Sequence, residues 1–117
     1  MTTVKVVNLT PHQVTVFDDH DEVVVTYPPS GEVARLESVF EEHGALNDGS
    51  PFGSLIYGAL AGLPEPDGTR LFIVSLPVKL AALDREDVLA VACEVRDAQG
   101  RVVGCKALAT VLRMEQV

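Results

Sequence analysis

Residues 68–83, GTRLFIVSLPVKLAAL, contain the pattern that decides the fold. Leu71–Val74 is a continuous apolar run, which predicts a buried strand. A short helix is expected from about Leu76 to Leu83, because Ser75 occupies an N-cap position and Pro77 lies in the first turn, where its missing N–H costs nothing. A strand that leads into a helix presents free backbone amides at the helix start, and such amides bind anions.

The rest of the chain is dominated by short segments rich in β-branched or alternating apolar residues, a pattern typical of strands. Polar turn residues at Asp18–Asp21 and Asp97–Gly100 join neighbouring segments and predict a hairpin at each place. The predicted strands are Val4–Leu9, Gln13–Phe17, Glu22–Tyr27, Ser54–Ala59, Val88–Arg96 and Arg101–Val111.

Two segments in the middle of the chain complete the prediction. Glu32–His43 contains the alternation of a strand, but its Ala, Arg, Leu and Glu content also favours a helix, so both alternatives stay open. Glu41–Pro51 is acidic and rich in turn residues, which predicts an exposed loop. We therefore expect a single domain over residues 1–117, mainly β within the α+β class, with an antiparallel sheet or partly open barrel and one or two short helices.

Composition and charge narrow the range of partners. The 117 residues are 47% hydrophobic, which excludes a disordered chain, and only 5% aromatic with no Trp, which leaves few side chains for stacking on bases. The net charge is −8, and residues 1–78 account for all of it, with 11 acids against 3 bases. Because this excess repels a phosphate backbone, general nucleic-acid binding is not expected, whereas a small anion held by a few arginines is compatible with it.

The location follows from segments that the sequence lacks. MTTVKVVNLT contains neither the charged nor the apolar region of a signal peptide, and no apolar run approaches the roughly 20 residues of a membrane span. We expect a cytoplasmic protein with no membrane association. In that compartment Cys93 and Cys105 are expected as reduced thiols, although adjacent predicted strands leave a disulfide open. Without a C-x-x-C spacing or paired histidines, no metal or cofactor is predicted.

The candidate ligand-binding residues are mostly basic. Arg35 follows a Pro-Pro-Ser-Gly turn and has no adjacent acid, which favours contact with a phosphate or carboxylate. Ser75 would contribute the amides of the helix start, and it lacks the Gly-x-Ser-x-Gly elbow of a nucleophile, so a capping role is predicted for its hydroxyl. Arg96 and Lys106 complete the predicted site, with an ion pair to Asp97 as the alternative for Arg96.

Three groups of residues resemble a family of small phage, prophage and actinobacterial proteins. They are Asn8-Leu9-Thr10-Pro11-His12, Pro29-Ser30-Gly31-x-x-Ala34-Arg35 and the late run Gly62-Leu63-Pro64…Gly68-Thr69…Ile73-Val74-Ser75…Val95-Arg96-Asp97-x-x-Gly100-x-Val102-x-Gly104-Cys105. The resemblance covers nearly the whole chain and implies binding rather than catalysis. A distant relation to phage anti-defence sponges, which sequester cyclic nucleotide or cyclic ADP-ribose signals, would imply an oligomer with arginines at subunit boundaries. Lys106 stands where that relation would place an arginine.

Three hypotheses about function follow. The first is a non-enzymatic, homo-oligomeric binding protein that sequesters a small anionic nucleotide signal. The alternative is a structural or protein-interaction subunit, such as a phage accessory or assembly protein, which would pair with copies of itself through the aliphatic segments Val23–Val25 and Leu108–Leu112. The third is a small hydrolase that uses Ser75 or His12.

Overall fold

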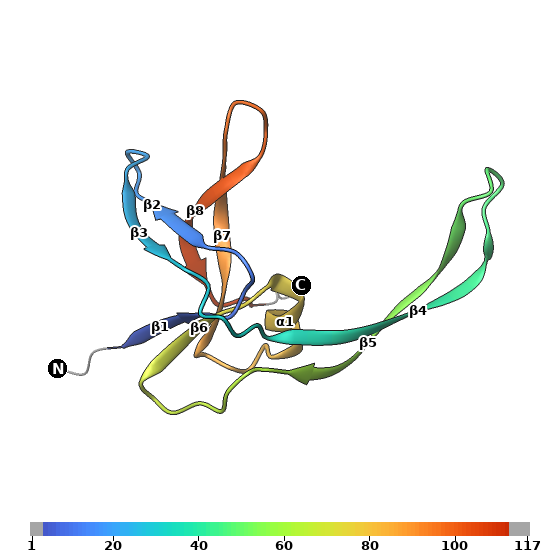
Figure 1. Ribbon diagram of the computed structural model, residues 1–117, viewed down its shortest axis with the longest axis horizontal. Coiled ribbons are helices and arrows are strands. Elements are labelled where there is room, and N and C mark those ends of the chain that lie inside the picture. Colours follow the sequence, from blue (N-terminus) through green and yellow to red (C-terminus); the bar gives the residue numbers. More distant parts are fainter. Residues whose placement is uncertain (1–3, 113–117) are drawn as a thin grey trace, which may run out of the picture.

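The computed structural model describes residues 4–112, which are mostly strand. Six strands form one sheet in the order β1-β6-β7-β8-β2-β3, and two further strands, β4 and β5, form a separate ribbon that leaves the sheet beside α1 (Figure 1). The elements are β1 (Lys5–Asn8), β2 (Val14–Phe17), β3 (Val23–Tyr27), β4 (Arg35–Ala45), β5 (Pro51–Ala61), β6 (Arg70–Ile73), α1 (Leu76–Ala81), β7 (Val88–Arg96) and β8 (Val102–Ala109).

The sheet is mixed and does not close into a barrel. The predicted hairpins β2–β3 and β7–β8 are present and antiparallel. Three other pairs, β1–β6, β6–β7 and β2–β8, are parallel. The mainly β prediction is therefore confirmed, but the sheet is not purely antiparallel. The reason lies in the connections, because α1 carries the chain back across the sheet between β6 and β7, which a parallel pair requires.

The core lies on both faces of β6, as the apolar run in this strand predicted. Phe72 and Val74 pack with Leu9, Ala34, Val78 and Val88 on the face that α1 covers. Ile73 points to the other face and packs with Val14 and Cys105. Phe72 and Ile73 are completely buried, which is the environment expected of a strand enclosed on both faces.

Asn8, in the first of the family-like motifs, ties three segments together. Its side-chain amide donates to the carbonyl oxygens of His12, at 2.8 Å, and Tyr27, at 3.0 Å. Its Oδ1 accepts from the backbone N–H and the hydroxyl of Thr10, at 2.9 and 2.7 Å. Asn8 is only 2% exposed, so this network holds the β1–β2 connection against the end of β3 in a site with little water.

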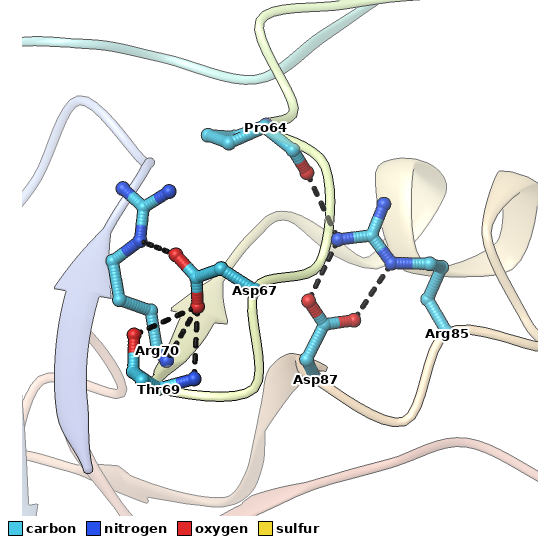
Figure 2. A network of polar contacts seen from close by, with 6 residues as sticks. All are labelled: Pro64, Asp67, Thr69, Arg70, Arg85 and Asp87. Carbon is cyan, nitrogen blue, oxygen red and sulfur yellow. Dashed lines mark hydrogen bonds and ion pairs between the residues drawn. The ribbon is translucent and has the colours of Figure 1, made fainter.

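A second network fixes the connections around α1 (Figure 2). Arg85 makes a two-pronged contact with Asp87 at 2.7 Å and donates to the Pro64 carbonyl at 2.9 Å, which joins the α1–β7 link to the segment that follows the ribbon. The side-chain hydrogen bond from Arg85 lowers the pKa of Asp87. Nearby, Lys79 is completely buried and donates to the Arg85 carbonyl at 2.7 Å, and burial lowers the pKa of this lysine.

The ribbon of β4 and β5, here called the arm, resolves the open question in the middle of the chain. Glu32–His43 is not a helix, since β4 begins at Arg35 and continues to Ala45. The loop expected over Glu41–Pro51 is wrong, because only residues 46–50 form the turn and the flanking residues pair across the arm. The predicted strand Ser54–Ala59 is confirmed within the longer β5. The far part of the arm projects away from the sheet, with no other element beside it (Figure 1).

Glycines allow β4 and β5 to approach closely and to shift register along the arm. Leu36 pairs with Leu60 and Ser38 with Tyr57, so β5 contains one extra residue beside Gly58. At Gly53 the two strands approach so closely that a Cβ would overlap the carbonyl oxygen of Glu41. The glycines of this apolar segment therefore serve a bulge and a close backbone approach.

Candidate functional site

The root of the arm borders an open hollow of about 600 Å³. Arg35, the first residue of β4, and Ser75, which precedes α1, both line it although they are 40 positions apart in the sequence. Its other lining residues are mostly apolar and include Leu9, Pro11, Leu36, Tyr57 and Val78. The fold thus brings together two of the four predicted site residues, in a cleft large enough for a small molecule.

Arg35 differs from the other arginines in its ionic contacts. In residues 4–112, Arg70, Arg85, Arg96 and Arg101 each pair with a carboxylate, at 2.6 to 3.2 Å, whereas no such pair is present for Arg35. Arg35 is exposed and lines the hollow, and no hydrogen bond from its side chain is found in residues 4–112, so its donors are open to a ligand. Glu37 lines the same hollow, so the local charge is one cation and one anion.

Ser75 occupies the predicted N-cap position of α1, with extended backbone geometry, but its hydroxyl makes no capping hydrogen bond. The helix has only six residues and begins with Pro77 in its first turn, which removes one of the amides that an anion would use. Ser75 also borders a second hollow, of about 660 Å³, together with His12. No hydrogen bond between Ser75 and His12 is found in the described part of the chain, so the two do not form a nucleophile–base pair in this geometry.

Arg96 and Lys106 lie outside the hollow at the root of the arm. Arg96 contacts Glu94 at 2.9 Å and donates to the carbonyl of Gly100 at 2.7 Å, so it supports the β7–β8 turn. Lys106 lies 3.4 Å from Asp21, in the β2–β3 turn. The four predicted residues therefore occupy three places, and their ligand-binding role stays a prediction.

Cys93 and Cys105 do not form a disulfide. Both are free thiols, with Cys93 exposed and Cys105 buried, and burial raises the pKa of the Cys105 thiol. Within residues 4–112, no group of three His, Cys, Asp or Glu side chains is arranged to hold a metal ion. The same residues contain no helix with the length and apolar character needed to cross a membrane.

The arm is a second candidate surface, which sequence reasoning missed. Cross-strand neighbours place apolar pairs on both of its faces: Val39 with Ile56 on one, and Phe40 with Leu55 on the other. Their exposed fractions lie between 48% and 66%, so neither face packs against the body. Of the seventeen exposed large apolar residues that the structure describes, seven belong to the arm: Val39, Phe40, Leu46, Phe52, Leu55, Ile56 and Tyr57.

A signal for this surface existed in the sequence. Eleven consecutive residues without a charge, Pro51–Ala61, stand in a chain whose net charge is −8. The segment was assigned to a strand, and strands of this composition are normally buried, so exposure could not be read from the pattern alone. The expected aliphatic surfaces were elsewhere. Val23 and Val24 are indeed exposed on the edge strand β3, whereas Leu108 is half-buried against the core.

Comparisons of this chain with protein-family models, with curated proteins and with solved structures find no match. The hollow and the arm are the two features of the described residues that bear on function.

Proposed function

We propose that this protein is a non-catalytic subunit that assembles with copies of itself through the arm. One observation supports this most strongly: seven large apolar side chains, each about half exposed, are gathered on the outer part of a ribbon, where no other described element lies beside them. At about 100 Å² each they expose about 700 Å² in total over the two faces, against about 300–600 Å² for the largest single apolar patch on a typical monomer. A two-stranded ribbon is also marginally stable by itself and gains from a partner.

Light scattering across a concentration series tests this function. We expect the mass to rise above that of one chain between low micromolar and several hundred micromolar protein. A variant in which residues 39–56 are replaced by Asn-Gly should stay monomeric, because Ser38 and Tyr57 are paired neighbours and a two-residue turn can close the shortened hairpin. A wild-type protein that is monomeric at the highest concentration refutes the proposal.

The hollow at the root of the arm favours a second candidate function, the binding of a small anion such as a nucleotide. Its support is the convergence of Arg35 and Ser75 on one cleft, together with the lack of a carboxylate partner for Arg35 in the described residues. Because the Arg35 side chain has no hydrogen-bond partner in the described residues, its guanidinium is able to make a two-pronged contact with phosphate.

A thermal-shift screen with a nucleotide panel, cyclic dinucleotides and cyclic ADP-ribose included, tests this second function. A binding nucleotide should raise the melting temperature of the wild type and leave Arg35→Ala unchanged, with the folds of both proteins intact. Arg101→Ala is the matched control, since Arg101 is an exposed arginine that pairs with Asp97 far from the hollow. Absence of a shift across the whole panel contradicts anion binding.

A further inference from the structure

The outer edge of β5 is open and lacks the usual protection of an edge strand. In residues 4–112, β5 pairs only with β4, so one row of its backbone N–H and C=O groups has no strand beside it. Natural edge strands are kept apart by charges, prolines or short length. β5 has eleven residues, no charge, and its one proline, Pro51, at the first position. Its bulge beside Gly58 lies near the root, and the second register shift of the arm places its extra residue in β4, so residues 53–57 of β5 keep an unbroken register.

The two strands of the arm differ sharply in charge. β4 carries Glu37, Glu41 and Glu42, all exposed, whereas β5 carries no charged side chain. Pairing of two copies through β4 would place these acids on adjacent strands, about 5 Å apart, where like charges are destabilising. Pairing through β5 would leave the two β4 strands three strand spacings apart, about 14 Å, which exceeds the Debye length of about 8 Å at physiological salt.

From these observations, and resting on the self-assembly proposed above, we propose that the occupant of this edge is the β5 strand of a second copy. The two β5 strands would run antiparallel about a twofold axis at their midpoint, Ile56, and form a continuous ribbon of order β4-β5-β5-β4. The apolar pairs Val39–Ile56 and Phe40–Leu55 of each copy would then continue across both faces of the ribbon.

The size of this contact sets the strength of the dimer. An edge of eleven residues is about 37 Å long, and a ribbon about 10 Å thick gives a buried area of about 400 Å² per copy. The total of about 800 Å² belongs to weak, reversible interfaces. Monomer and dimer should therefore exchange in the micromolar range of concentration, which is accessible to sedimentation.

Two substitutions on cross-strand neighbours test the edge. Ile56→Lys places like charges next to each other at the twofold axis, and we expect it to weaken dimerisation by at least about tenfold in sedimentation experiments. Val39→Lys is the matched control, because Val39 is on the same face and at least as exposed but lies one strand farther from the axis. It should change the dissociation constant by less than about threefold. Equal loss in both variants, or none in Ile56→Lys, overturns the β5 edge while self-assembly itself still stands.

Cross-linking gives a positive signal that does not depend on loss of association. In a Cys93→Ser background, Ile56→Cys should form a disulfide-linked dimer on mild oxidation, because the two Cα atoms at the axis would lie about 5 Å apart, within the range that a disulfide spans. Val39→Cys should stay monomeric at the same concentration, with its Cβ atoms about 14 Å apart. Efficient cross-linking through Val39→Cys but not Ile56→Cys would show that the copies meet through another surface.

Discussion

Replacement of Asn8 by alanine should destabilise the whole body of the protein. The substitution removes two donated and two accepted hydrogen bonds and leaves the carbonyls of His12 and Tyr27 and the amide of Thr10 without that partner. A buried polar group that loses its partner costs about 1–3 kcal/mol. His12 is exposed and Tyr27 half-buried, so water replaces part of the loss, and we expect the free energy of unfolding to fall by about 2–4 kcal/mol.

Urea unfolding measures this loss directly. With a slope of about 1.5 kcal/mol per molar urea, the midpoint should fall by about 2 M. Ser30→Ala is a suitable control, because the Ser30 hydroxyl is exposed and contacts only Glu32 in its own turn, so its midpoint should change little. A loss below about 1 kcal/mol in Asn8→Ala would refute the reasoning, since the network would then contribute no more than one ordinary hydrogen bond.

Two other predictions concern titratable groups. Asp87→Asn should lower the free energy of unfolding by about 1–3 kcal/mol at neutral pH, because Arg85 loses one of its two acceptor oxygens and the negative charge that faces it. Since the folded state lowers the pKa of Asp87, this contribution is present above its unfolded value of about 3.9, so the difference between wild type and variant in urea unfolding should shrink below about pH 4 and vanish only below the lowered pKa of the folded state. One thiol per folded chain, Cys93, should react rapidly with a disulfide reagent, and Cys105 only after unfolding; two fast thiols in the native protein would contradict the described burial.

The sequence predicts the strands of the sheet well because side chains pack against at least one face of these strands, and burial leaves a pattern in the sequence. Leu71–Val74 is the clearest case, where an apolar run predicted burial and β6 is enclosed on both sides. The parallel pairing of β1 with β6 could not be predicted, since the 61 residues between these strands include the whole arm. Local patterns report which face of a strand is buried, but they contain no information on which distant strand lies beside it.

Two of the four predicted site residues lie at one place for a similar reason. Arg35 and Ser75 line the same hollow because the backbone of Ala34 bonds to Leu9, which in turn bonds to the end of β6, so the arm begins next to α1. Arg96 and Lys106 instead contact Glu94 and Asp21. For Arg96 an ion pair was expected, but its predicted partner Asp97 is wrong, because Asp97 pairs with Arg101 instead. The contact of Lys106 depends on the parallel pairing of β2 with β8.

The arm was missed because neither face of its strands is buried in the outer part, so the sequence shows no buried-face pattern there. A strand with one buried face alternates and a strand buried on both faces is a continuous apolar run, and these patterns, together with β-branched content, were the evidence for the strands of the body. In β4 and β5, apolar residues occur on both faces and all of the large ones in the outer arm are exposed, so Glu41–Pro51 looked like a loop from its acids and turn residues. Apolar residues on both faces are costly in water, and no other described element of this chain covers the outer arm. The uncharged edge of β5 favours a second copy as its neighbour, which would cover the side chains along that edge and leave the two faces of the wider ribbon open.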